Sequence, residues 1–407
     1  MRPTIEYWFD FSCPFAYLGS VGIEDLAERT NANLKLKPML LGGVFRARAV
    51  PQNLAASVGE SKARHNLNDM RRYATYWNVP FEMPNGHPLR TVNALRAVLA
   101  AGEPFNKLMH SFYRAYWVEG LDISTDEQIE NVLTRSGYDA ESLMHEMKSD
   151  RIKKELFERT DEAIAKGIFG APGLLVDGTL FWGQDRMRMV EYALTGKHEA
   201  LDLEKAPVYD TDFYFDYASP FAFLAMKQVR SMFQEKLRYR PVFLGGLWKE
   251  TNPRALLVNP NNTKHDYLGA DFRRQAAQQG TPQRWPSVFP IKSTLALRVT
   301  LLSENQPELI EAIFDAYWQK NQDISEPQVI EDICKELGLD GAHLVLAATK
   351  DEAKKDLRDA TQLAIDAGVF GAPTTVVHLE DSPPALYWGN DRLWMAALAA
   401  RGENKVI

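Results

Sequence analysis

The chain repeats itself at the scale of a domain. The stretch IEYWFDFSCPFAYLGS at 5–20 returns as TDFYFDYASPFAFLAM at 211–226, so Asp10 recurs as Asp216. Three further motifs return in the same order, namely GG at 42–43 and 245–246, FGAP at 169–172 and 370–373, and WGQDRM at 182–187 as WGNDRL at 388–393. The offsets stay between 201 and 206 residues, which predicts two domain-sized copies and excludes an array of short repeats.

Length and charge fit this division. Each copy of about 200 residues is long enough to bury its own core, and we expect domains at 1–205 and 206–407. The chain is 45% hydrophobic and 25% charged, as globular proteins are. A net charge of −7 provides no basic field, so nucleic acid and membranes are not expected as partners.

Several further classes are disfavoured. No apolar run approaches the roughly 20 residues that span a bilayer, and the N-terminus has no signal-peptide pattern, so we expect a cytoplasmic protein. The two cysteines, Cys13 and Cys334, occupy non-equivalent places and suggest no disulfide framework. Metal-binding cysteine and histidine patterns are absent from the sequence, and we expect no metal.

The hydrophobic pattern predicts a β-α-β opening in each copy. Alternating segments at 5–11 and 212–217 read as strands, and the proline that follows each suits a first helical position. Second strands are expected at 34–41 and 237–244. Helical insertions, at about 45–165 and 248–366, separate this opening from a closing β-β-α part.

Turn and cap signals refine the helical and closing parts. Asp177-Gly178 suits a type I′ hairpin turn, whereas the second copy has a longer loop there. Ser124 with Glu127, and Ser325 with Gln328, match capping boxes and predict helix starts at equivalent places.

The first candidate for chemistry is the junction between the opening strand and its helix. A helix N-terminus stabilises an anion, and Cys13 directly precedes Pro14 there. A thiol in such a place can have its pKa lowered from about 8.5 to about 3.5–7.5. The alternative is a buried, inert cysteine. The second copy has Ser219 at the same point, which favours a functional position for the pair.

Two other repeated steps are candidates for ligand binding. Ala171-Pro172 and Ala372-Pro373 are either ordinary trans loop prolines or, in a thioredoxin-like sheet, cis-prolines that leave the preceding backbone free to pair with an extended ligand. Asp185-Arg186 and Asp391-Arg392 either cap a helix or receive the amino and carboxylate groups of a peptide-like ligand.

Together these motifs resemble one family. FDFxxPFxYL, the GG after the second strand, GxFGAP and WGxDR look like the 2-hydroxychromene-2-carboxylate isomerase group. That group is related to kappa-class glutathione transferases, in the DsbA-like branch of the thioredoxin fold. The resemblance implies an α/β chain of two tandem DsbA-like thioredoxin-fold domains, each with a helical insertion. It also implies glutathione as cofactor, bound across the cis-proline and the first helix.

The resemblance assigns roles to residues. Ser219 matches the family serine that hydrogen-bonds the glutathione sulfur, an interaction worth about 1.5–3 kcal/mol, or about one to two pKa units. The residues implied to bind glutathione are Asn53, Ala171, Pro172, Gln184, Asp185, Arg186, Asn252, Ala372, Pro373, Asn390, Asp391 and Arg392.

The first copy departs from the family pattern. Cys13 replaces the serine, as in DsbA-like oxidoreductases, but Ala16 stands where a C-x-x-C motif has its second cysteine. A dithiol cycle within that half is therefore not available, although Cys13 could form a mixed disulfide with glutathione or act as a donor in place of serine.

We therefore expect a glutathione-dependent isomerase or transferase for small aromatic or electrophilic substrates, with Ser219 stabilising the thiolate. The alternatives are a thiol-disulfide oxidoreductase that uses Cys13 and a non-catalytic glutathione-binding module. Because the family commonly pairs two subunits, the tandem chain could reproduce such a pair internally.

Overall fold

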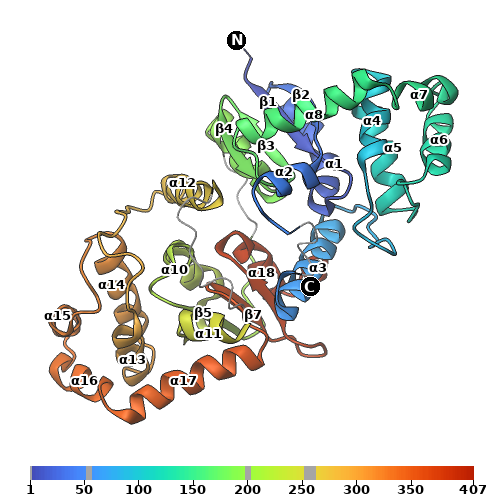
Figure 1. Cartoon of the computed structure of the whole chain (residues 1–407). Helices are drawn as coiled ribbons and strands as arrows, with labels where there is room; N and C mark the ends of the chain where they lie inside the picture. The colour runs from blue at the N-terminus through green and yellow to red at the C-terminus, as the bar shows by residue number, and fades with distance from the viewer. Residues whose placement is uncertain (1, 52–56, 198–202, 252–262) are drawn as a thin grey trace. The chain divides into compact units, whose positions relative to one another are not determined.

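The computed structural model describes residues 2–51, 57–197, 203–251 and 263–407. It divides into two compact units, one made of Met1–Ser57 with Met70–Ala200 and the other of Val58–Asp69 with Leu201–Ile407. Each unit contains one four-stranded sheet (Figure 1). By its contacts, therefore, a short segment from the first copy of the sequence belongs to the second unit.

The sheet of unit 1 has the order β2-β1-β3-β4. The central strand β1 (Thr4–Phe9) pairs in parallel with β2 (Asn33–Pro38) and antiparallel with β3 (Gly173–Val176), which pairs with β4 (Thr179–Trp182). Parallel neighbours need a crossover, which α1 (Pro14–Arg29) supplies. The predicted α/β fold with a β-α-β opening is confirmed.

Unit 2 repeats this topology as β6-β5-β7-β8. Its strands are β5 (Thr211–Phe215), β6 (Leu237–Pro241), β7 (Thr374–Val377) and β8 (Ala385–Trp388), and its crossover helix is α10 (Pro220–Phe233). Both units close with a 3-10 turn and a helix, η2 (Gln184–Arg186) with α9 (Met187–Thr195), and η5 (Asn390–Arg392) with α18 (Leu393–Ala399). The duplicated motifs thus occupy equivalent positions in two copies of one fold.

The hairpins agree with the turn signals. Asp177 and Gly178 both have positive φ, 46° and 84°, as a type I′ turn requires, and they join β3 directly to β4. In unit 2 the connection between β7 and β8 is longer, as predicted.

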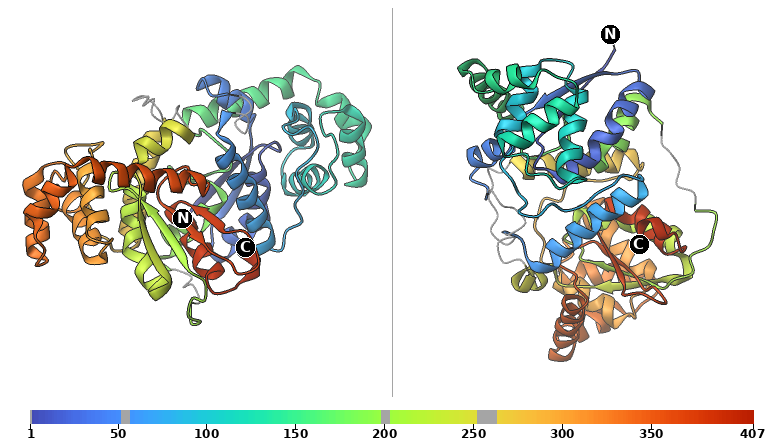
Figure 2. Two further views of the ribbon diagram at one scale, coloured as in Figure 1. Left: turned by 90° about the horizontal axis from the view of Figure 1, so that it is seen from below. Right: turned by 90° about the vertical axis from the view of Figure 1, so that its right-hand side faces the viewer.

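Helical insertions fill the middle of each unit. In unit 1 the helices are α2 (Leu41–Ala47), α3 (Glu60–Tyr76), α4 (Val92–Ala101), α5 (Asn106–Trp117), α6 (Asp126–Arg135), α7 (Ala140–Glu146) and α8 (Asp150–Ala165). In unit 2 they are α11 (Leu244–Thr251), α12 (Thr263–Gln278), α13 (Thr294–Leu302), α14 (Pro307–Trp318), α15 (Pro327–Glu336), α16 (Gly341–Ala348) and α17 (Asp351–Asp366). Within unit 1, α4 to α7 gather to one side of the sheet, as α13 to α16 do within unit 2 (Figures 1 and 2). The helix α3 is divided between the units, because its residues up to Asp69 belong to unit 2 and those from Met70 onward belong to unit 1.

The predicted capping boxes are wrong in detail, although a helix does begin near each. Thr125 caps α6 by accepting a hydrogen bond from the Gln128 amide at 3.3 Å. Ser124 instead donates its amide and hydroxyl to Asp122, and Ser325 does the same with Asp323. The aspartate two residues earlier captures each serine in a local turn, so the serine cannot cap the helix.

No helix in the described ranges is both long and apolar enough to cross a membrane.

Candidate active site

In unit 2 the segment after the opening strand β5 ends at Ser219, which is the N-cap of α10. The Ser219 hydroxyl accepts a hydrogen bond from the Ala222 amide at 3.2 Å and donates to the carbonyl of Ala372 at 2.9 Å. The Ala372-Pro373 bond is cis, as the thioredoxin-like interpretation expected. The structure therefore brings Ser219 directly against the cis-proline segment.

In unit 1 the same junction holds a thiol. Cys13 donates to the carbonyl of Ala171 at 3.0 Å, and Ala171-Pro172 is also cis. The residue is 7% exposed, and burial raises the pKa of the Cys13 thiol to about 12 against the opposing hydrogen bonds from the Ala16 and Phe15 amides. The expected lowering of this pKa is wrong, because desolvation outweighs the helix N-terminus. Cys13 is a neutral thiol at physiological pH.

The backbone beside the cis-prolines differs between the units. Within the described residues, the amide N–H groups of Ala171 and Ala372 donate to no acceptor. Ala171 is buried, whereas Ala372 is partly exposed. An unpaired amide in a partly exposed residue next to a sheet can pair with an extended ligand. Only the second unit offers one here.

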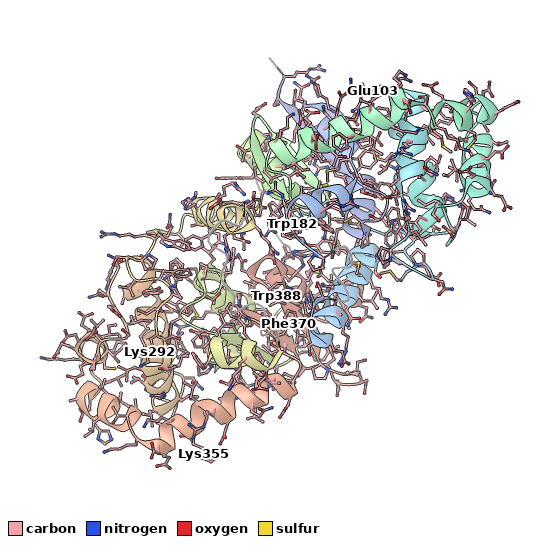
Figure 3. All side chains as sticks on the ribbon, in the orientation of Figure 1. Glu103, Trp182, Lys292, Lys355, Phe370 and Trp388 are labelled. Atoms are coloured by element: carbon pink, nitrogen blue, oxygen red, sulfur yellow. The ribbon has the colours of Figure 1, made fainter. Side chains whose placement is uncertain are left out.

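The tryptophan of each WG motif packs on the phenylalanine and glycine of the FGAP motif in the same unit, which explains why the two motifs recur together. The Trp388 ring lies over Gly371, where an added Cβ would come within 2.5 Å of the indole nitrogen, and Phe370 packs beside it with ring centroids 5.1 Å apart (Figure 3). Trp182 packs in the same way on Gly170 and Phe169. Glycine at this point is required by the close approach of the indole.

The Asp-Arg step is built from ion pairs. Gly389 has φ of 101°, and the following turn places Asp391 beside Arg392, with 3.3 Å between Oδ1 and Nη1. In unit 1, Asp185 pairs with Arg186. The N-cap positions of these turns and helices are occupied by glycine or arginine, not by the aspartates.

The segment 58–69 adds three side chains to this part of unit 2. Arg392 donates from Nε and Nη2 to the Asp69 carboxylate, each at 2.9 Å, with both side chains largely buried. His65 Nε2 accepts from the Trp388 amide at 3.1 Å. Lys62 Nζ lies 4.7 Å from the Trp388 ring centroid. Burial, followed by the charge of Lys264, lowers the pKa of Lys62 to about 8.

Sequence reasoning missed these residues, although a signal was present. Lys62 recurs as Lys264, and Asp69-Met70-Arg71-Arg72 recurs as Asp271-Phe272-Arg273-Arg274. The shared offset of 202 residues falls within the range of the other repeats.

The remaining predicted residues are placed as follows. Asn390 donates to Gln275 at 2.6 Å, and Gln184 is buried, with no hydrogen-bond partner for its amide nitrogen among the described residues. Asn53 and Asn252 lie outside the described residues.

A buried carboxylate braces each junction. Asp216 accepts hydrogen bonds from the amides of Ala218 and Leu244 and from the side chain of Ser293. Leu244 and Ser293 begin two helices of the insertion, so Asp216 ties these helices to the turn before Ser219. Asp10 makes the equivalent bonds in unit 1, to Ser12, Leu41 and Thr91. Burial raises the pKa of both carboxyl groups against these donors.

A cavity of about 610 Å³ lies elsewhere, at the C-terminal end of α3 in unit 1. It is lined by Arg71, Ala74, Thr75, Asn78, Val79, Pro80 and Phe81, none of which is a predicted site residue. In the described ranges, no group of three or more acidic, histidine or cysteine residues is arranged to hold a metal ion.

Comparison with known proteins agrees with this geometry. The model of the DSBA-like thioredoxin domain matches twice, at residues 4–195 and 211–399. The chain belongs to that family. It is 28% identical over 193 residues to the 2-hydroxychromene-2-carboxylate isomerase of Sphingobium xenophagum, covering 47% of this chain and 97% of that protein.

A second relative is the glutathione S-transferase kappa 2 of Caenorhabditis elegans, 29% identical over 223 residues, covering 51% and 98% of the two chains. The solved structure of a 2-hydroxychromene-2-carboxylate isomerase superposes with a TM-score of 0.43 at 22% identity, covering 47% of this chain and 94% of that one. This DSBA-like protein is therefore homologous, at low identity, to isomerases and to glutathione transferases.

Proposed function

We propose that the second half of this DSBA-like protein is a glutathione-dependent isomerase or transferase that acts on a small aromatic or electrophilic substrate. The observation that carries the proposal is the Ser219 hydroxyl, held at a helix N-terminus 2.9 Å from the carbonyl that precedes a cis-proline. Relatives named as isomerases and kappa-class transferases support the same activity.

The residues present in unit 2 fit glutathione. The unpaired amide of Ala372, a partly exposed residue, suits the peptide backbone of the cofactor, while Lys62 and the partly exposed Asp391 carboxylate offer charges of both signs for its termini. Glutathione would supply a thiolate nucleophile that adds to an electrophilic carbon. In an isomerisation the thiolate would leave again, whereas in a transfer to a halogenated aromatic it would stay bonded and the carbon–halogen bond would break to release halide.

The chain's own part is to hold the thiolate form. Ser219 can turn its proton from the Ala372 carbonyl toward a bound sulfur anion while Oγ still accepts from the Ala222 amide. The N-terminus of α10 adds a positive potential at the same point. Both effects favour the ionised sulfur over the neutral thiol.

The geometry of unit 1 gives little support to the alternative function, a thiol-disulfide oxidoreductase that uses Cys13. Cys13 is buried, its thiol has a pKa of about 12, and Ala16 replaces a resolving cysteine. A thiol of this kind is a weak nucleophile at neutral pH.

The test compares Ser219→Ala with Cys13→Ala in the full chain. Glutathione affinity is measured by titration calorimetry, and turnover by glutathione conjugation of a halogenated nitroaromatic and by isomerisation of a hydroxychromene carboxylate. We expect Ser219→Ala to lose at least tenfold in kcat/KM and Cys13→Ala to keep it. The opposite pattern would assign the activity to the first half, and binding without turnover of either substrate would favour a non-catalytic module.

A further inference from the structure

Unit 2 exposes three large apolar side chains on one short loop between α12 and α13. Trp285 is 41% exposed, Val288 47% and Phe289 44%. The rings of Trp285 and Phe289 lie against each other, with centroids 4.8 Å apart and planes inclined by 55°. Apolar groups gathered in this way on a surface commonly mark a binding site.

The loop that carries them is fixed by hydrogen bonds. Arg284 donates its amide to the carbonyl of Trp318 at 2.7 Å, Ser287 donates its amide to Asn321 at 2.6 Å, and the Tyr317 hydroxyl donates to the carbonyl of Val288 at 2.8 Å. The aromatic pair is therefore presented by an anchored backbone, which lowers the entropy cost of binding a ligand.

Two routes of contact join this pair to the junction at Ser219. Both rings pack on Trp318, at 5.6 and 6.1 Å between centroids, and the Trp318 indole donates to the carbonyl of Tyr217 at 2.9 Å. Tyr217 lies two residues before Ser219.

The second route starts two residues after Ser219. Phe221, in the first turn of α10, packs on Phe272 at 6.5 Å, and Phe272 packs on Trp285 at 5.7 Å. Phe221 is half-buried and Phe272 is fully buried, so a line of ring contacts through the interior joins the start of α10 to the loop.

The first copy lacks this surface. The cis-prolines Pro88 and Pro290 set the equivalence of the two loops, so that Met83 and His87 stand where the second copy has Trp285 and Phe289. Met83 and His87 are only partly exposed, and His87 bonds the Tyr116 hydroxyl at 2.8 Å. The two exposed aromatic rings are thus a property of the half that has the serine.

We propose that Trp285, Val288 and Phe289 form an acceptor platform in unit 2, which binds the planar aromatic ring of the electrophilic substrate. This inference rests on the proposed function and deepens it, because it names the residues that select the substrate. Ring stacking on Trp285 and Phe289, with the Val288 side chain at the edge, would favour flat aromatic molecules over aliphatic ones.

The test uses 1-naphthol as the probe and the full chain. The double variant Trp285→Met with Phe289→His installs the first copy's residues, and Phe157→Ala removes an exposed ring, 68% accessible, from α8 in unit 1. Titration calorimetry should show affinity for 1-naphthol about tenfold or more weaker in the double variant and unchanged in Phe157→Ala. Trp285→Phe, which keeps a ring, should retain most of the affinity.

Glutathione affinity, measured on the same samples, separates this proposal from the one on which it rests. Unchanged glutathione binding in the double variant shows that the fold and the serine site are intact. Equal 1-naphthol affinity in wild type and double variant, or no saturable binding to wild type, would overturn the platform. If glutathione binds to no form while the double variant still loses 1-naphthol, the platform stands and the glutathione proposal fails.

Discussion

Ser219 Oγ and the carbonyl oxygen of Ala372 lie 2.9 Å apart, while the equivalent pair in the first half, Cys13 Sγ and the Ala171 carbonyl, lies 3.0 Å apart. The two halves thus place an oxygen and a sulfur in nearly the same geometry. Both groups donate to the carbonyl, but a hydroxyl is a stronger hydrogen-bond donor than a neutral thiol.

The first prediction concerns the thiol of bound glutathione. Ser219→Ala removes a hydrogen bond to the thiolate, so the pKa of the bound thiol should rise by about one to two units. Ultraviolet absorbance of the thiolate, followed against pH, measures it. Ser219→Thr keeps the hydroxyl and should stay near wild type. An unchanged pKa in Ser219→Ala would show that the serine does not contact the sulfur.

The second prediction is that Cys13 resists alkylation. With a pKa of about 12, its thiolate fraction at pH 7.5 is smaller than that of free cysteine by a factor of about a thousand or more. Reaction with iodoacetamide in a Cys334→Ala background should be slower by about that factor and should still accelerate at pH 10. Modification at the rate of free cysteine would restore the oxidoreductase hypothesis.

The third prediction concerns the glycine beneath Trp388. Gly371→Ala places a methyl carbon 2.5 Å from the Trp388 indole nitrogen, so the ring must move, at a cost of about 1–3 kcal/mol in the free energy of unfolding. Urea unfolding measures the loss. The control must be a glycine that tolerates a side chain. Gly402 is unsuitable because its φ is positive, whereas Gly269 lies in a helix and an added methyl there would meet Arg273 Nη1 only at 3.8 Å. Gly269→Ala should therefore not destabilise the protein.

The fourth prediction concerns Asp69. Asp69→Asn removes one of the two carboxylates that pair with the largely buried Arg392, Asp391 being the other, and loss of one partner of a buried pair costs up to about 3–5 kcal/mol. Glu403→Gln, which breaks the exposed pair with Lys205, should cost about 0–1 kcal/mol. Equal unfolding free energies for the two variants would contradict the importance of the Asp69 pair.

The fifth prediction is a dependence on pH. The pKa of Lys62 is lowered to about 8 in the folded chain, whereas an unfolded lysine holds its proton to about pH 10.4. Between these values the unfolded chain binds more protons, so this group makes the unfolding free energy rise with pH. Lys62→Met should remove that part of the slope between pH 8 and 10. Identical slopes for variant and wild type would show that the Lys62 pKa is not lowered.

Much of the fold could be predicted from the sequence because its signals are local. The alternating residues of β1, the proline after Cys13 and the Asp177-Gly178 turn each act through their immediate neighbours. The repeated motifs resemble the family pattern, and that resemblance predicted that Ser219 and Cys13 lie against the cis-prolines.

Other properties depend on distant contacts and could not be predicted in this way. The pKa of Cys13 depends on burial, which the position of a residue in the chain does not reveal. Burial raises this pKa, whereas the N-terminus of the helix alone would lower it. Asp69 meets Arg392 across 323 residues of sequence. The predicted serine caps before α6 and α15 are wrong for a local reason instead, because an aspartate two residues earlier accepts the hydrogen bonds of each serine.

The inclusion of residues 58–69 in the second unit has a genetic consequence. A gene cut between the two copies would encode a downstream polypeptide in which Arg392 has lost the Asp69 carboxylate and Trp388 has lost Lys62. Inheritance as one open reading frame therefore preserves a set of contacts that neither descendant would recover on separation.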